Sequence, residues 1–334
     1  MIAAPFRVAR PRSIEGAVRL LSDHGPQAML IAGGTDLLPN LQMRLFSPGL
    51  LVDLKSVRQL SGVEYSREGG LRVGSTTTLS RLLEFPAIHS EFPVLAAAVR
   101  VVAGPLQRNM GTLGGNLCLE TRCRWYNQSH FWRTALGGCL KKDGNICHVA
   151  PGGKFCWAAW SGDAAPALLA LDAEIEIVGA RGARRIPLRE FYKNDGMDRI
   201  ALARDEILTA IHVPPRMAGW TGTYRKLRVR DSIDYPLAGV AVALQLDAHG
   251  ICRDARAALS AVNPAPRLVP EANESLAGER FSIELVERIA HAAIRTAKPL
   301  TTSASTPEYR REMVKLFTRR ALEDAWRESP NSVQ

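Results

Sequence analysis

Two glycine-rich segments contain the residues best suited to binding a phosphorylated ligand. Residues 31–40 are IAGGTDLLPN, and residues 108–118 are RNMGTLGGNLC. Small residues let backbone N–H groups approach a phosphate closely, and the threonine hydroxyls add donors. For the first segment alone, a tight turn that needs positive φ explains the glycines equally well. The two segments together predict one diphosphate held between them.

Neither segment matches the common nucleotide-binding patterns. Neither has G-x-G-x-x-G at the opening of a helix, and neither contains the lysine of a P-loop. A Rossmann dinucleotide site and an NTPase site are therefore set aside.

Four cysteines lie in a segment without hydrophobic periodicity, at about residues 119–160. Cys123, Cys139, Cys147 and Cys156 have the spacing C-x15-C-x7-C-x8-C. Long segments without regular structure are uncommon in compact domains, so we expect something other than a hydrophobic core to order this insert. Thiolates suit zinc or an iron–sulfur cluster. The paired C-x2-C of structural zinc is absent, which favours a cluster but leaves zinc and unliganded thiols open.

Other candidate ligands fall outside this set. Cys118 and Cys252 are expected to be ordinary buried cysteines. His130 and His148 lie in the insert, but four cysteines already complete a cubane, so we expect them to pack nearby or to lie at the surface.

Hydrophobic periodicity predicts the elements that position these residues. A helix is expected after an N-cap at Ser13, with Gly25 as its stop, and Asp163 is expected to cap a second helix at 165–171. Strands are predicted near 28–31, 50–54, 71–74, 173–179 and 206–214.

The last third of the chain has a different pattern. Three strand patterns within 222–262 precede helices near 282–297 and 307–328, with Thr306 and Pro307 as N-cap and first helical residue of the last. The fold class predicted is α+β, with domains at 1–55, 56–218 (including the insert) and 219–334.

Composition and charge narrow the class of protein. No apolar run approaches the roughly 18–20 residues of a membrane span, and the N-terminus lacks the apolar core of a secretory signal. We therefore expect a cytoplasmic protein without disulfides. The net charge of +10 comes from scattered residues, which favours a basic docking face over nucleic-acid binding. Arginine pairs such as 310–311 are expected to be solvated.

The two glycine segments, taken with three later stretches in the same order, resemble the FAD-binding medium subunits of the molybdenum hydroxylase family. The later stretches are SGDAAPALLALDAEIEIVG, DEILTAIHVP and YRKLRVRDSIDYPLAGVAVAL. The resemblance spans nearly the whole chain. It implies two α/β subdomains of the vanillyl-alcohol oxidase (PCMH) type that bind FAD, followed by a domain with a three-stranded antiparallel sheet and helices.

The resemblance also implies which residues contact the flavin. Lys226 would offset anionic charge, Ile207 and Leu208 would form an apolar wall, and Asp163 would bind a polar flavin atom. For Leu208, plain core packing is the alternative. The implied FAD-binding residues are Ala32, Gly33, Gly34, Thr35, Asp36, Leu37, Gly111, Thr112, Gly114, Gly115, Asn116, Asp163, Ile207, Leu208 and Lys226.

The insert is unusual in that family and resembles the branch formed by the β subunits of 4-hydroxybenzoyl-CoA reductases. TRCRWYNQSHFWR, CLKKDG, ICHV and FCWA form this match. It implies a [4Fe–4S] cluster on the four insert cysteines. It also implies partners: a molybdopterin-binding large subunit and a [2Fe–2S] small subunit in a dimer of heterotrimers, with ferredoxin as electron donor. The implied role is electron transfer in anaerobic aromatic degradation, with no catalytic residue on this chain.

Two rival hypotheses remain. The first is a flavoprotein subunit of an oxidative molybdenum hydroxylase of the xanthine, aldehyde or carbon monoxide dehydrogenase type, against which the insert argues. The second is a zinc or nucleic-acid binding module, which leaves both glycine segments unexplained.

Overall fold

The N-terminal part of the chain forms a small parallel sheet covered by one amphipathic helix. The computed structural model describes residues 3–329, and its first sheet has the strand order β1-β3-β2. The Ser13 hydroxyl accepts from the Gly16 N–H, and Gly25 (φ 49°) ends the helix, so both predicted helix signals are confirmed. The elements are β1 (Arg7–Ala9), α1 (Ile14–His24), β2 (Ala28–Ile31), α2 (Leu37–Gln42) and β3 (Leu50–Asp53).

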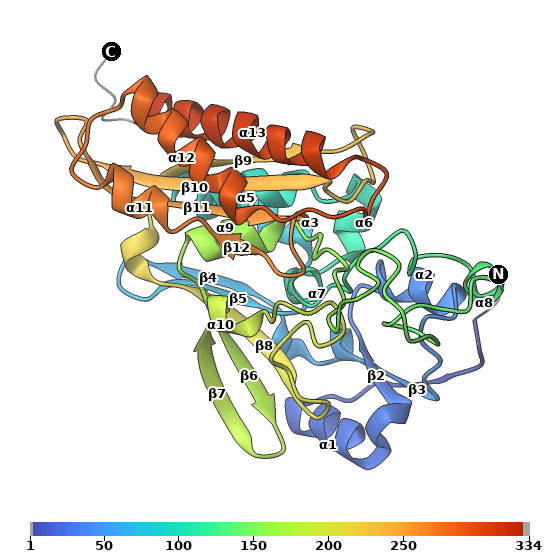
Figure 1. Ribbon diagram of the computed structural model, residues 1–334. Helices are drawn as coiled ribbons and strands as arrows, with labels where there is room; N and C mark the ends of the chain where they lie inside the picture. The colour runs from blue at the N-terminus through green and yellow to red at the C-terminus, as the bar shows by residue number, and fades with distance from the viewer. Residues whose placement is uncertain (1–2, 330–334) are drawn as a thin grey trace.

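The middle part is a five-stranded antiparallel sheet whose inner face packs against short helices. Its strand order is β4-β5-β8-β6-β7 (Figure 1). The strands are β4 (Val63–Ser66), β5 (Gly70–Gly74), β6 (Glu174–Gly179), β7 (Gly182–Pro187) and β8 (Ile207–Val213). The helices are α3 (Leu79–Glu84), α4 (Pro86–Ser90), α5 (Pro93–Arg100), α6 (Pro105–Met110), α7 (Leu113–Leu117), α9 (Ala164–Ala170) and α10 (Leu188–Phe191).

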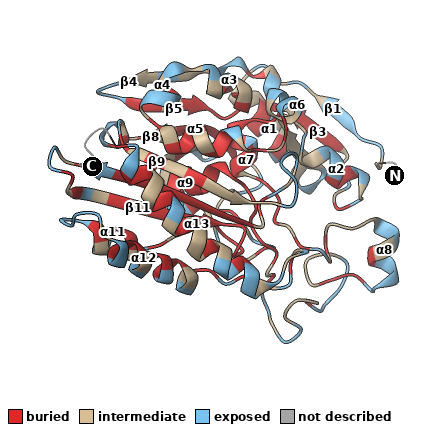
Figure 2. Ribbon diagram, turned by 90° about the horizontal axis from the view of Figure 1, so that it is seen from above, coloured by how far each residue is buried: buried red, intermediate tan, exposed pale blue. Residues whose placement is uncertain are grey.

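The C-terminal sheet is buried on both faces. In β10 (Ala238–Leu246), Val240 and Val242 pack under α12 (Ile283–Thr296) and α13 (Pro307–Arg327), whereas Ala241 faces the core of the middle part. Figures 1 and 2 show this sheet between the two helical layers. The remaining elements are β9 (Thr221–Leu227), β11 (Cys252–Ser260), β12 (Arg267–Leu268) and α11 (Glu271–Leu276).

The insert is mostly irregular and is held against the N-terminal part. Its helix α8 (His130–Ala135) lies at the edge of the molecule in Figure 2. The buried Arg133 guanidinium donates to the backbone oxygens of Met43 and Arg44 at 3.1 and 3.0 Å. The insert therefore depends on contacts with another part of the chain for its position.

Most features of the predicted fold are confirmed. The chain is α+β, and the two-residue β12 adds a fourth strand to the three predicted C-terminal strands. The Thr306 cap is also confirmed. The three domain boundaries stay a prediction. Within residues 3–329, no helix has the length and apolar character needed to cross a membrane.

Two sequence predictions about polar residues are wrong. The Asp163 carboxylate makes no cap bond to α9, because it binds elsewhere, and the Asn116 side chain accepts from the Ala164 N–H at 3.2 Å instead. Arg310 is buried rather than solvated. Its guanidinium donates to the backbone oxygens of Leu237, Leu300 and Ala261 and so ties α13 to the C-terminal sheet.

Replacing Arg310 tests this anchor. We expect Arg310→Met to lower the free energy of unfolding by about 3 kcal/mol, because buried carbonyl oxygens lose their donors. Chemical denaturation followed by circular dichroism measures the change. Arg311→Met is the matched control, because Arg311 is exposed, and it should stay within about 0.5 kcal/mol of wild type. Equal losses in both variants would contradict the anchor.

Candidate functional site

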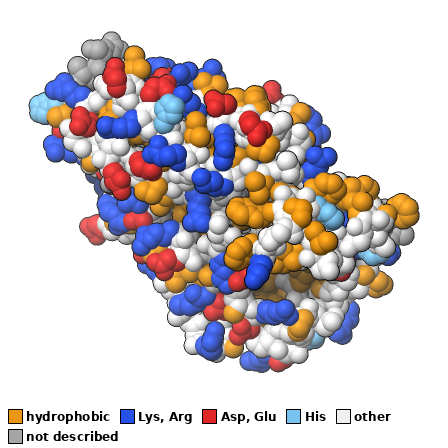
Figure 3. Space-filling view, in the orientation of Figure 1, with side chains coloured by type: hydrophobic (Ala, Val, Ile, Leu, Met, Phe, Trp, Pro, Cys, Tyr) orange, Lys and Arg blue, Asp and Glu red, His pale blue; other side chains and the backbone are white. Residues whose placement is uncertain are grey.

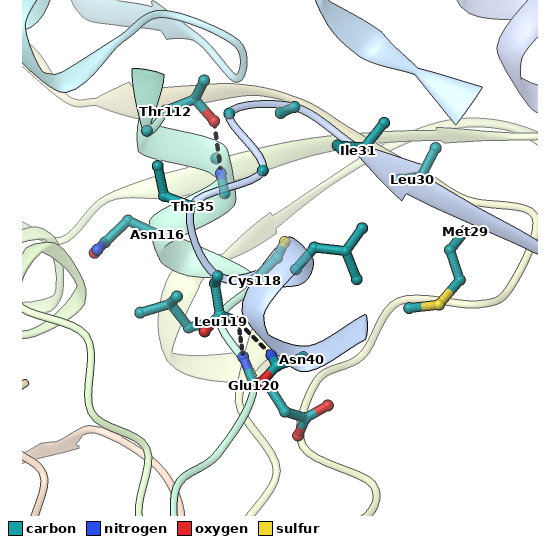
Figure 4. Close-up of a pocket in the computed structure, with 18 of the residues that line it drawn as sticks. Met29, Leu30, Ile31, Thr35, Asn40, Thr112, Asn116, Cys118, Leu119 and Glu120 are labelled. Atoms are coloured by element: carbon teal, nitrogen blue, oxygen red, sulfur yellow. Dashed lines mark hydrogen bonds between the residues drawn. The ribbon is translucent and has the colours of Figure 1, made fainter. Parts of the chain in front are cut away.

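The two glycine segments touch each other through their backbones. A Cβ atom at Gly33 would overlap the Met110 carbonyl oxygen and lie only 2.7 Å from the Cα of Gly111. The Thr35 hydroxyl lies on the same side, 3.3 Å from where a Cβ of Gly111 would be. Figure 4 shows the first segment running alongside α7. Only glycine permits this close approach.

These segments form one wall of a cavity of about 1200 Å³. This exceeds the roughly 300–1000 Å³ of most small-molecule pockets, which suits a large dinucleotide. The walls come from all three parts of the chain and from the start of the insert. The predicted residues that line it are Ala32, Gly33, Gly34, Thr35, Asp36, Leu37, Gly111, Thr112, Gly114, Gly115, Asn116, Asp163 and Leu208.

The second glycine segment is more regular than expected. Residues after Thr112 form the short helix α7, and the Thr112 hydroxyl caps it by accepting from the Gly115 N–H at 3.1 Å. A Cβ atom at Gly114 would lie 2.7 Å from the Ser75 carbonyl oxygen, so α7 packs directly on the chain that follows β5. A hydroxyl that accepts a hydrogen bond keeps its own hydrogen to donate, so Thr112 retains a donor.

Several buried polar atoms on the cavity wall have no partner within the described residues. They are the Asn40 Oδ1, Ser75 Oγ and Arg122 Nε atoms. Leaving a buried polar group unpaired costs about 1–3 kcal/mol, so such groups are normally satisfied by a ligand or water. Their residues line the cavity, but the unpaired atoms themselves are inaccessible to solvent and are not directed at a ligand.

Asp36 connects the first glycine segment to distant parts of the chain. Its carboxylate accepts from the Arg122 guanidinium, from the Tyr235 hydroxyl at 3.0 Å and from the Glu120 N–H at 3.3 Å. The Arg122 guanidinium also stacks over the Tyr235 ring at 3.8 Å. Sequence analysis did not identify Arg122 or Tyr235 as site residues, because no local pattern links them to the glycine segments. Asp36 thus links segments of the cavity wall that are far apart in the sequence.

Asp163 and Lys226 form a buried ion pair. The Lys226 ammonium lies 2.9 Å from the Asp163 carboxylate and donates to the Val101 carbonyl oxygen, and the Tyr224 hydroxyl donates to Asp163 at 2.8 Å. Burial raises the pKa of Asp163, and the Lys226 charge acts in the opposite direction. Lys226 is not among the residues that line the cavity. The Lys226 charge is already paired with Asp163, so its predicted role in offsetting ligand charge stays a prediction.

Ile207 and Leu208 do not form a common apolar wall. They are neighbours in β8, where successive side chains point to opposite faces. Leu208 lines the cavity, whereas Ile207 is buried against Leu21 and Val52 in the N-terminal core. The predicted apolar wall of Ile207 and Leu208 is therefore corrected, because the Ile207 side chain is not part of it.

The four insert cysteines are buried in one region. Cys123, Cys139 and Cys156 share an apolar cluster with Leu45 of the N-terminal part, and Cys147 is near enough to act on the pKa of both Cys123 and Cys156. Burial raises the pKa of the Cys156 thiol to about 11. Within residues 3–329 no three Cys, His, Asp or Glu side chains gather closely enough to hold one metal ion.

The other cysteines and the insert histidines lie in different surroundings. Every cysteine is free. Cys118 is half-buried and lines the cavity, contrary to the expected plain core position, whereas Cys252 is fully buried in β11. His130 is exposed, and the His148 ring packs against Trp125 with centroids 5.1 Å apart.

The insert exposes hydrophobic side chains. Figure 3 shows such side chains gathered on the side of the molecule that carries the insert. Phe131 is 84% exposed and Phe155 is 60% exposed. Exposed apolar side chains gathered on one surface are typical of a surface that binds a partner protein.

The fold and the cavity define a flavin-binding subunit, and comparison with known proteins identifies the family. Residues 4–216 match the model of the FAD binding domain in molybdopterin dehydrogenase, and residues 222–325 match the carbon monoxide dehydrogenase flavoprotein C-terminal domain. The chain belongs to the FAD-binding subunits of the molybdenum hydroxylase family, and it is an oxidoreductase subunit with an FAD-binding domain.

Individual relatives match over almost their full length. The chain is 28% identical to a putative xanthine dehydrogenase FAD-binding subunit of Escherichia coli, covering 95% of this chain and 94% of the relative. It is 31% identical to the nicotine 6-hydroxylase medium subunit of Paenarthrobacter nicotinovorans, covering 96% and 97%. Among solved structures, the carbon monoxide dehydrogenase of Hydrogenophaga pseudoflava matches with a TM-score of 0.79 and 28% identity, covering 98% and 99%.

Gly33 offers a test of the cavity wall. We expect Gly33→Ala to abolish FAD retention, because the added Cβ separates the two glycine segments. Flavin released from purified protein, measured by absorbance per chain, reports the loss. Gly16→Ala is the control, because a Cβ there meets nothing closer than 3.4 Å, and it should keep its flavin. Full flavin content in Gly33→Ala would contradict the close packing.

Proposed function

We propose that this chain is an electron-transfer subunit that carries both FAD and a [4Fe–4S] cluster within a molybdenum hydroxylase complex. Its partners in this proposal are a molybdopterin-binding large subunit and a [2Fe–2S] small subunit, arranged as a dimer of heterotrimers. The observation that supports the second redox centre is the gathering of the four insert cysteines in one buried region beside the cavity.

The residues around the cavity suit FAD. The backbones of the two glycine segments would hold the diphosphate. Leu208 gives an apolar surface on which a flavin ring can lie. The flavin supplies the redox chemistry, so the chain itself needs no acid, base or nucleophile.

The cysteine region suits an iron–sulfur cluster better than a zinc ion. Zinc binds four ligands at about 2.0–2.3 Å from one centre, which demands tightly gathered sulfur atoms. A cubane binds each cysteine through a different iron atom and so accepts a wider set. The four cysteines are buried, and three of them share one apolar cluster, which supports the wider ligand set of a cubane over a single zinc ion.

Cys139→Ser tests the cluster. In the anaerobically purified complex, we expect the wild type to contain about four more iron atoms per copy of this chain than the variant. A cubane loses stability when one of its thiolate ligands is missing. Iron analysis and electron paramagnetic resonance (EPR) measure the difference. Cys252→Ser is the control, since Cys252 is buried in β11 outside the insert. If Cys139→Ser kept the same iron content as wild type, the assignment would be wrong.

Two directions of electron flow are candidates. The insert supports the reductive one, in which ferredoxin supplies two electrons and 4-hydroxybenzoyl-CoA gains them with two protons to give benzoyl-CoA and water. The named relatives, a xanthine dehydrogenase subunit, a nicotine hydroxylase subunit and a carbon monoxide dehydrogenase, favour the oxidative one. Their sequences cover nearly the whole chain, so the oxidative direction has the broader support.

Assays of the purified complex separate the two directions. Oxidation of xanthine, an aldehyde or carbon monoxide with an acceptor dye, without reduction of 4-hydroxybenzoyl-CoA by reduced methyl viologen, would establish the oxidative function. The opposite result would establish the reductive function. Because the relatives named above act oxidatively, we expect the first outcome.

A further inference from the structure

A second, smaller cavity lies beside the large one, and we call it the hairpin pocket. Its volume is about 400 Å³, and its walls come from the turn of the β6–β7 hairpin, the segment after α10 and the loop before β8. In Figure 1 this hairpin projects from the middle part of the molecule. Leu202, Ala203 and Glu206 line both cavities. A ligand in the hairpin pocket would therefore lie against a segment that also borders the large cavity.

The charged side chains of the hairpin pocket are mostly positive. Arg181 lies in the turn between β6 and β7, Arg184 lies in β7, and Lys193 follows α10. Among the described residues that line the pocket, Glu206 is the single carboxylate. Concave surfaces lined by charges of one sign concentrate the electric field, so the excess of cations attracts an anion.

Arg184 is fixed in place by the wall that the two cavities share. Its Nε and Nη2 atoms donate to the Glu206 carboxylate at 3.1 and 2.8 Å, and Nη2 also donates to the Ala201 carbonyl oxygen at 2.8 Å. Within the described residues these bonds use Nε and Nη2, which leaves the two N–H groups of Nη1 to a ligand. A donor that is already fixed loses little freedom when a ligand binds.

The other two cations have spare capacity to bind an anion. The Lys193 ammonium contacts both oxygens of Asp198 at 2.8 and 2.7 Å, but the Asp198 side chain is 68% exposed, so solvent screens this pair. Arg181 is exposed and forms no ion pair within residues 3–329. An anion in the pocket would give both cations a partner.

We propose that the hairpin pocket binds a phosphate group, either as the free ion or as the end of a small phosphorylated molecule. Guanidinium groups match phosphate oxygens with paired hydrogen bonds, and an ammonium adds a compact charge. A phosphate monoester carries a charge of about −1.5 to −2 at pH 7, which Arg181 and Lys193 are placed to offset. The volume lies within the roughly 300–1000 Å³ of small-molecule pockets. This inference goes beyond the proposed function and needs no iron–sulfur cluster.

The competing explanation is that these cations only protect the edge of a sheet. β7 is an edge strand, and charged side chains on such strands prevent pairing with other chains. Arg185 fits that role, because it pairs with Glu174 at 3.2 Å and does not line the pocket. Its neighbour Arg184 has the opposite direction in the strand and lines the pocket. The two adjacent arginines therefore provide a comparison within one strand.

The experiment is isothermal titration calorimetry of the full chain loaded with FAD, which keeps phosphate out of the large cavity. The probes are inorganic phosphate and ribose 5-phosphate, each added at constant ionic strength in chloride buffer. We expect saturable binding, and Arg181→Met should weaken it about tenfold, because one charge-assisted contact is lost. Lys193→Met should weaken it about threefold, because part of the Lys193 charge is already used by Asp198.

The two probes distinguish the sources of the phosphate group. Tighter binding of ribose 5-phosphate would identify a phosphorylated molecule as the ligand, and tighter binding of inorganic phosphate would identify the free ion. Arg185→Met is the matched control and should bind as the wild type does. Binding of neither probe would overturn the inference. So would equal binding by wild type, Arg181→Met and Lys193→Met, or an equal loss in Arg185→Met, which would show an effect of net charge alone.

Discussion

The direct contact between the two glycine segments is the constraint on which the site depends. Gly33 packs against the backbone at Met110 and Gly111 with no room for a Cβ atom, so the segment after β2 meets the segment between α6 and α7 at one point. The cavity opens beside that contact. Its other walls are then held by side chains that reach across the chain, above all by Asp36. A shift of either glycine segment would therefore change the shape of the cavity.

Three carboxylates on the cavity wall are each paired with a basic side chain. Asp36 is paired with Arg122, Asp163 with Lys226, and Glu120 with Lys141. Because these cations already have partners, we expect ligand binding to depend mainly on backbone groups of the glycine segments. Buried ion pairs contribute little net stability when compared with apolar packing, so their value here lies in holding the walls and in shaping the local potential.

The sequence predicts the features that depend on near neighbours. The caps at Ser13 and Thr306 act over three residues, and the alternation in β6 repeats every two, so both are visible in the sequence. Short exposed strands such as β7 lack that alternation and were missed. Pairs such as Asp36 with Arg122 join residues 86 positions apart, and nothing local marks them. The burial of Arg310 could not be predicted from the sequence for the same reason.

The insert illustrates how a segment without its own core becomes ordered. Arg133 binds the backbone at Met43 and Arg44, the Arg124 N–H donates to the Thr302 carbonyl, and Leu45 packs among the cysteines. These contacts come from distant parts of the chain, so the insert depends on both the N-terminal and the C-terminal parts for its position. A redox centre placed there would then be fixed relative to the flavin wall, because the insert begins on that wall. Fixed relative position is what electron transfer between two centres requires.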